Sequence, residues 1–190
     1  MAFRGGVMFA RALRGLRLCK RFGKARSGSA AVEFAIVAIP FFLLTVGLAE
    51  ISMIGFAQTS LDLGVSEAAR QIRTGRAQMG GLGHADIKAR ICDEVNNFVV
   101  LECDGNLFID VDRFDSFVDA SSSDNNPIQD NEFQEDGFGY QPGAASDIVV
   151  VRAYYRWHVL TPLFEPIFQN VSGGERILVT TMMFRNEPFQ

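Results

Sequence analysis

The chain has 190 residues, of which 48% are hydrophobic and 21% are charged. This composition excludes a disordered chain, and the length fits one domain of ordinary size. The formal net charge is -4, but residues 1–28 contain eight of the 18 Lys and Arg residues and no acid. The rest of the chain is therefore strongly acidic and would repel phosphate, which argues against a nucleic-acid-binding protein.

An apolar run follows this basic arm. Residues 34–49, FAIVAIPFFLLTVGLA, contain no charged side chain, and Glu33 is the only charge between Ala30 and Ala49. About 20 helical residues cross a bilayer core of about 30 Å, so the block is long enough to span a membrane. The positive-inside rule then predicts that residues 1–28 lie in the cytoplasm and the body on the other side.

The helical pattern continues beyond the apolar run. Apolar residues recur at helical spacing as far as residue 73, and glycines at positions 75, 80, 81 and 83 end the pattern. We predict one helix over about residues 30–73, with residues 29–57 in the membrane and an amphipathic second half. Pro40 lies inside this helix and predicts a kink rather than a break.

The remaining residues, 58–190, predict an extracytoplasmic α+β domain. A short amphipathic helix is expected over residues 84–100, and strands over 107–114, 147–160 and 177–184. One face of the second strand is wholly apolar and is formed by Val149, Val151, Ala153, Tyr155, Trp157 and Val159. Its opposite face contains Arg152, Tyr154, Arg156 and His158.

Between the first two strands lies an acidic segment, residues 115–145, with seven acids and no Lys or Arg. It is rich in Ser, Asn, Gly and Gln, so we predict a long surface loop. The three strands then form a small antiparallel sheet that packs on the outer half of the long helix.

The junction between the arm and the helix has an unusual charge. Residues 26–34 read RSGSAAVEF, with Glu33 five residues beyond Gly28. A charge at a bilayer centre costs about 2.5–3.5 kcal/mol and less near an end, so an acid retained there usually has a partner. Cleavage after Gly28 would give Ser29 an α-amine that can neutralise Glu33 of a neighbouring subunit. Alternatively, Glu33 reaches the lipid headgroups beside Arg26.

The junction and the helix resemble the TadE-like minor pilins, or pseudopilins, of the tight-adherence (Flp) pilus, which is a type IV-like pilus. The resemblance rests on SAAVEF after Gly28, on the Pro-containing apolar helix, on LDLGVSEAARQIRTG and on the ending TTMMFRNEPF. A later Glu of the family corresponds to Glu50. The resemblance implies a pilin-like fold, cleavage after Gly28 by a prepilin peptidase, and a role in pilus assembly.

The resemblance also implies a location and partners. A single-pass protein of the bacterial inner membrane, with its C-terminal domain in the periplasm, is expected, and its incorporation into the pilus stays open. The implied partners are the prepilin peptidase, the major Flp pilin, other minor pilins and the inner-membrane pilus platform. Glu33 and Glu50 are the candidate assembly residues. They project about 100° apart on a helix, and Glu50 is expected to be solvated at the far membrane interface, with a partner contact as the alternative.

Cys92 and Cys103 are the two cysteines of the body. An extracytoplasmic location permits a disulfide between them, and two buried free thiols are the alternative. The sequence contains no recognisable set of nucleophile and base, no metal-ligand spacing and no cofactor fingerprint. We therefore expect neither an enzyme nor a bound cofactor or metal.

Two other interpretations explain the N-terminal region differently. In one, an ordinary signal peptidase cuts after Ala49, where Gly47 and Ala49 supply the small residues that it requires, and releases a soluble secreted domain. In the other, the Arg-rich residues 1–28 are a mitochondrial transit peptide. The first residue of the mature chain, Ser29 or Glu50, distinguishes the pilin from the secreted domain.

Overall fold

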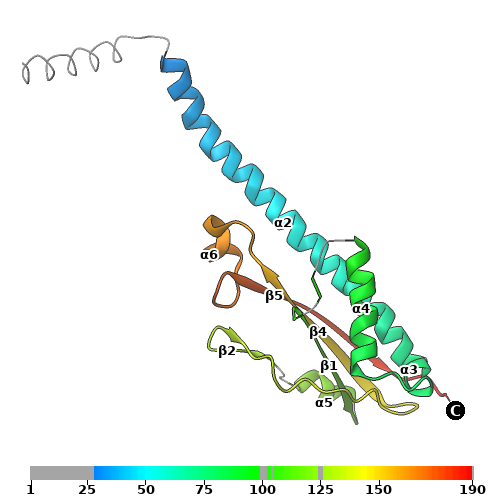
Figure 1. Ribbon diagram of the computed structural model, residues 1–190. Coiled ribbons are helices and arrows are strands. Elements are labelled where there is room, and N and C mark those ends of the chain that lie inside the picture. Colours follow the sequence, from blue (N-terminus) through cyan, green and yellow to red (C-terminus); the bar gives the residue numbers. More distant parts are fainter. Residues whose placement is uncertain (1–27, 99–101, 104, 124–125, 190) are drawn as a thin grey trace, which may run out of the picture. The chain divides into compact units, whose positions relative to one another are not determined.

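The computed structural model describes residues 28–190 apart from 99–101, 104, 124–125 and 190. The predicted leader, residues 1–28, therefore lies outside the described residues except for Gly28. The chain forms two compact units, which divide after Leu48. Helix α2, Ser29–Arg73, supplies residues to both units (Figure 1). The prediction of one helix over residues 30–73 is confirmed, and the helix continues through Pro40.

In the first unit, α2 exposes almost all of its large apolar side chains. These include Val32, Phe34, Ile36, Val37, Ile39, Phe41, Phe42 and Leu44. The helix is long and apolar enough to cross a membrane. Proline is tolerated inside such a helix where local adjustment satisfies the freed carbonyl.

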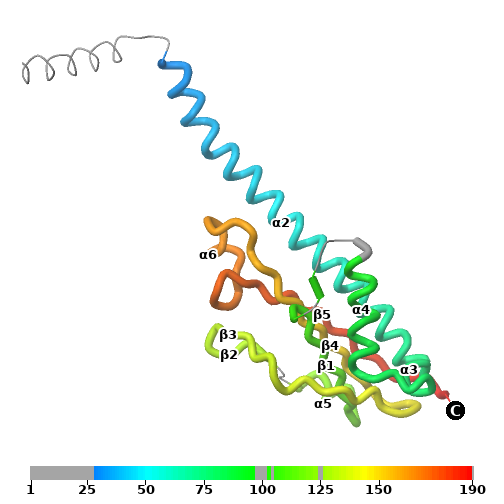
Figure 2. Tube along the Cα trace, in the orientation of Figure 1, coloured from blue at the N-terminus to red at the C-terminus, as the bar shows by residue number. Residues whose placement is uncertain are grey.

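The second unit is built on a three-stranded antiparallel sheet. Its strands are β1 (Leu107–Phe114), β4 (Ile148–His158) and β5 (Glu175–Arg185), in the order β1-β4-β5. The short helix α3 (Arg76–Met79) leads from α2 to α4 (His84–Phe98), and Figure 2 follows this path along the chain. The predicted fold class, α+β with a long helix packed on a small antiparallel sheet, is confirmed.

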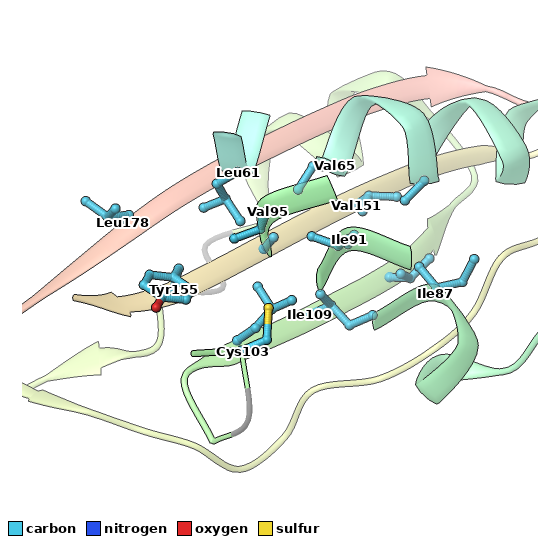
Figure 3. Packing of buried hydrophobic residues seen from close by; sticks show 14 of the residues in the cluster. Leu61, Val65, Ile87, Ile91, Val95, Cys103, Ile109, Val151, Tyr155 and Leu178 are labelled. Atoms are coloured by element: carbon cyan, nitrogen blue, oxygen red, sulfur yellow. The ribbon is translucent and has the colours of Figure 1, made fainter. Parts of the chain in front are cut away.

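The main core lies between one face of the sheet and the two helices. Leu61 and Val65 of α2, Ile87 and Ile91 of α4, and Val151 of β4 are among its buried residues (Figure 3). All six residues predicted for the apolar face of the second strand are buried. The period of two along this strand is therefore read correctly from the sequence, because every second side chain enters one core.

The other face of the sheet differs from the prediction. Within residues 115–145 the structure contains helix α5 (Phe117–Ser122) and the short strands β2 (Ile128–Gln129) and β3 (Glu132–Phe133). A continuous surface loop over 115–145 is therefore wrong. Four aromatic rings from this segment and the sheet pack together, namely Phe108, Phe133, Phe138 and Tyr154.

Two residues predicted for the polar face of β4, Arg152 and Tyr154, are buried under this cover. The many acids of the segment favoured the prediction of a surface loop, although its few aromatic residues pack on the sheet. The chain between β4 and β5 forms a 3-10 turn, η2 (Pro162–Phe164), and helix α6 (Glu165–Phe168).

Candidate processing junction and Glu50 contact

The described chain begins at the predicted processing junction. Gly28 is exposed and directly precedes α2, whose first residue is Ser29. A Cβ atom added to Gly28 would meet nothing within 4 Å. The described part of the fold therefore gives no steric reason for a glycine at this position.

Glu33 lies on the same face of α2 as Ser29. The Ser29 hydroxyl donates a hydrogen bond to Glu33 Oε1 at 2.9 Å, and both residues are exposed. Residues four apart on a helix are neighbours. An α-amine created at Ser29 by cleavage would consequently lie one helical turn from this carboxylate of its own chain.

Glu50 has a different environment. Only 3% of its surface is exposed, and its Oε1 accepts hydrogen bonds from the backbone N–H groups of Leu160 at 2.6 Å and Thr161 at 3.4 Å. The expectation that Glu50 is solvated is wrong. The strand β4 has just ended at this point, so these N–H groups have left the sheet ladder and need another acceptor. The carboxylate of Glu50 supplies it.

The second oxygen of the same carboxylate, Glu50 Oε2, is buried and has no hydrogen-bond partner among the described residues. The exposed Glu33 and the buried Glu50 thus have unlike surroundings. Glu33 presents a carboxylate on the helix surface, whereas Glu50 joins the start of the second unit to the end of β4.

A second polar contact fixes α2 on the sheet. Asp62 Oδ1 accepts hydrogen bonds from the Gln58 side-chain amide at 3.0 Å and from the Thr180 hydroxyl. The Gln58 amide also donates to the backbone carbonyl of Val179 in β5, at 3.1 Å. No local sequence pattern predicts this network, because Thr180 lies about 120 residues after Gln58 and Asp62.

A buried ion cluster lies on the opposite face of the sheet. The Arg152 guanidinium donates to Asp112 at 3.0 Å, to Asp110 at 3.4 Å and to the Ser123 hydroxyl at 2.7 Å. Burial first, and then the negative charge of Asp110, raise the pKa of the Asp112 carboxyl. Arg152 therefore joins β1 to the end of α5, with its charge compensated by carboxylates.

The two cysteines of the body lie together. Cys92 of α4 and Cys103, which precedes β1, are joined as a disulfide with their Cα atoms 5.7 Å apart. In the part of the chain that the structure describes, no group of three or more His, Cys, Asp or Glu residues is placed to hold a metal ion.

The fold and the junction define a class of protein: an N-terminal helix that can cross a membrane, followed by a small folded α+β body. Residues 28–70 match the model of the TadE-like protein family. The resemblance to TadE-like proteins is thereby confirmed over the junction and most of α2, and the matched segment includes Gly28, Ser29, Glu33 and Glu50. The match suggests a protein associated with the tight-adherence (Tad) pilus. Comparisons with curated proteins and with solved structures returned no match.

Proposed function

We propose that the protein is a minor pilin, or pseudopilin, needed to assemble a tight-adherence (Flp) type IV pilus. The observation that supports this most is the junction: an exposed Gly28 precedes a family-matched apolar helix with Glu33 in its second turn. In this proposal a prepilin peptidase cuts after Gly28 and Ser29 becomes the first residue. The role is structural and includes no catalytic step, cofactor or metal.

The exposed apolar side chains of residues 29–48 support anchoring in a membrane. Burying a Val, Leu, Ile or Phe side chain is worth about 1.5–3 kcal/mol, so a helix with this many exposed ones is strongly unfavourable in water. In the bacterial inner membrane they would contact lipid, with the C-terminal domain in the periplasm. In a fibre they would contact the helices of other subunits.

The partners proposed follow from the same helix. The major Flp pilin and other minor pilins would pack against its apolar surface, and the inner-membrane pilus platform would receive the anchored subunit. Glu33 is suited to pairing with the α-amine of a neighbouring subunit, since it is exposed at the start of the helix. The carboxylate of Glu50 is instead bonded within its own chain, to the backbone of Leu160 in the second unit.

One observation favours the secreted domain as a second candidate. The two compact units divide after Leu48, close to the bond after Ala49 that a signal peptidase would cut. A domain starting at Glu50 would keep nearly all of the second unit. Its new α-amine would, however, lie on the residue whose carboxylate already binds Leu160.

The test is the mass of the N-terminal peptide of the mature protein, isolated from membranes and from sheared pili of a piliated host. The proposal expects a chain that begins at Ser29. Gly28→Val should leave an uncut precursor and should not restore pili to a deletion strain, whereas Gly6→Val in the leader should be processed and active. A chain that begins at Glu50 would instead establish the secreted domain. A Gly28→Val protein that still begins at Ser29 would contradict the processing site.

A further inference from the structure

An exposed apolar patch lies on the segment after β4. Leu160, Leu163 and Ile167 are 61%, 61% and 68% exposed. The rings of Phe164 and Phe168 lie beside them, with centroids 5.6 Å apart. Within residues 160–168, LTPLFEPIF, Glu165 is the single charged residue. Several exposed apolar side chains within one short segment indicate an interaction surface.

The first residue of the patch is hydrogen-bonded to Glu50. The N–H group of Leu160, at the start of the segment, donates to Glu50 Oε1 at 2.6 Å. In the sequence, Glu50 directly follows the uncharged run of residues 34–49. If that run crosses the bilayer, as the proposed function requires, then Glu50 lies at the membrane surface and Leu160 lies at the same level.

The outer half of α2 shows the same apolar character just beyond Glu50. Ile51, Met53 and Phe56 are each about half exposed, although they follow the uncharged run. The exposed apolar surface therefore does not end with the run itself. Further exposed apolar side chains lie in the second unit, on residues 51–56 of the helix and on residues 160–168.

The segment is suited to a place of low polarity. The N–H group of Phe164 donates to the backbone carbonyl of Thr161 at 2.8 Å. The N–H group of Gln169 donates to the backbone carbonyl of Glu165 at 2.9 Å. Pro162 and Pro166 have no N–H group to satisfy. Backbone groups that are paired within the segment cost less to remove from water.

The single charge of the segment is turned back toward the protein. A Cβ atom on Gly174 would lie 3.0 Å from the carboxylate carbon of Glu165, so this side chain packs against Gly174. The exposed positions are therefore apolar, and the polar group is held on the inner side. This separation is typical of elements that lie in a membrane interface.

We infer that residues 160–168 insert into the boundary between the headgroups and the acyl chains of the bilayer, as a second membrane contact beside α2. The inference rests on the proposed membrane anchoring. A lipid surface is the occupant that fits, because the segment is bonded to Glu50, the residue that directly follows the uncharged run, and its exposed side chains carry no charge with which to select a protein partner. Two separate contacts would fix the orientation of the body on the membrane.

The experiment uses the full chain in lipid vesicles. Leu163→Cys, and Val118→Cys as the matched control, receive an environment-sensitive fluorophore in a Cys19→Ser background, and the Cys19→Ser protein alone gives the background labelling. Val118 is an apolar residue of α5 that is 73% exposed. Quenching is measured with spin labels on lipid acyl chains and with aqueous iodide. We expect the fluorophore at Leu163 to be quenched by the lipid label and to be severalfold less accessible to iodide than the fluorophore at Val118.

Equal iodide access at the two positions, without quenching by lipid, would overturn the inference. Protection from iodide at Leu163 without quenching by lipid would also overturn it, since a protein surface would then cover the patch. Flotation of the vesicles with the Cys19→Ser protein tests the membrane anchoring separately from the interfacial contact. Protein that floats while Leu163 stays exposed to water refutes only the interfacial contact, whereas protein that does not float refutes both the anchoring and the contact.

Discussion

Glu50 Oε1 accepts a hydrogen bond of 2.6 Å from the N–H group of Leu160, 110 residues later in the chain. The carboxylate is buried, so the bond is protected from competing water. It joins the first residues of the second unit to the end of its central strand. An acid that appears, from the sequence, to mark a membrane boundary is therefore also part of the folded body.

Replacing this acid should lower the stability of the body. Glu50→Ala removes the hydrogen bond between the buried carboxylate and the N–H group of Leu160, and a hydrogen bond to a charged group typically contributes about 1.5–3 kcal/mol of unfolding free energy. Glu50→Gln retains a carbonyl acceptor and should cost less. Denaturant unfolding of the mature chain in detergent measures the difference.

Glu67→Ala is the matched control, because the pair of Glu67 with Arg70 is exposed and should contribute less than about 1 kcal/mol. Equal stability of the Glu50→Ala and Glu67→Ala proteins would show that the contact with Leu160 is unimportant in solution.

Glu33 should affect assembly and not folding. Glu33→Gln removes the charge at nearly constant volume and leaves the second unit untouched. Its cellular amount should stay near that of the wild type, while its co-purification with the major and minor pilins should fall. Ser29→Ala, which removes the hydroxyl bonded to Glu33 but keeps the carboxylate, is the control and should co-purify normally. Undiminished co-purification of the Glu33→Gln protein would refute the pairing role.

Trp157 should be a major determinant of the body's stability. It is buried on the core face of β4, where truncation to Ala typically costs about 3–5 kcal/mol. This is a large part of the 5–15 kcal/mol that stabilises an ordinary domain. Trp157→Ala should therefore make the body sensitive to limited proteolysis.

The sequence alone would suggest Arg156 as the exposed control, but the structure shows that this choice is wrong. Arg156 pairs with Glu135 and Glu175 and lies over the rings of Phe108 and Phe133. His158, whose side chain is 61% exposed, is the better control. Equal protease sensitivity of the Trp157→Ala and His158→Ala proteins would mean that the assigned core face is incorrect.

The bond between Cys92 and Cys103 can be counted by mass. Alkylation of the denatured, unreduced mature protein should modify no thiol, and reduction should release two. The protein should run as a monomer without reductant, because the pair is intramolecular. For a loop of this length the chain-entropy account gives a stabilisation of about 3 kcal/mol. Two alkylated thiols before reduction would refute the bond and weaken the case for an oxidising compartment.

Tyr155 should make the stability of the body fall at alkaline pH. Burial, and then the charge of Glu102, raise the pKa of its phenol to about 12. The unfolded chain, in which a tyrosine has a pKa of about 10, ionises first and so binds fewer protons than the folded chain. The contribution is fully present below the unfolded pKa and is lost as the pH rises toward the folded pKa.

Tyr155→Phe should therefore show a shallower loss of unfolding free energy over this alkaline range than the wild type. It should also lose the hydrogen bond to the Glu102 carbonyl, which lowers its stability at neutral pH. Parallel stability profiles of the two proteins above pH 10 would contradict the raised pKa.

Periodic features of the chain were predictable and contact-dependent ones were not. The long helix and the buried face of β4 follow from local spacing of apolar residues, and both are confirmed. The packing of residues 115–145 on the sheet depends on a few aromatic residues among many acids, such as Phe133 and Phe138. These residues follow no period that the sequence would reveal.

The same distinction applies to the site. Gly28, Ser29 and Glu33 could be predicted as a processing junction because they lie within one short segment at a change in composition, and this stays a prediction. The burial of Glu50 was not predictable, because its hydrogen-bond donors belong to residues 160 and 161, and no local pattern links positions 110 residues apart.

The C-terminal strand closes the body in a way that affects when it can fold. The N–H group of Glu187 donates to the carbonyl of Arg73 at the end of α2, and β5 pairs along β4. The outer half of α2 is synthesised early, yet its partners in β4 and β5 are among the last residues to leave the ribosome. The part of the helix face that β4 and β5 cover must therefore wait uncovered through most of synthesis, although α4 follows early, and a chaperone or a membrane surface that shields it during that time would favour correct folding over aggregation.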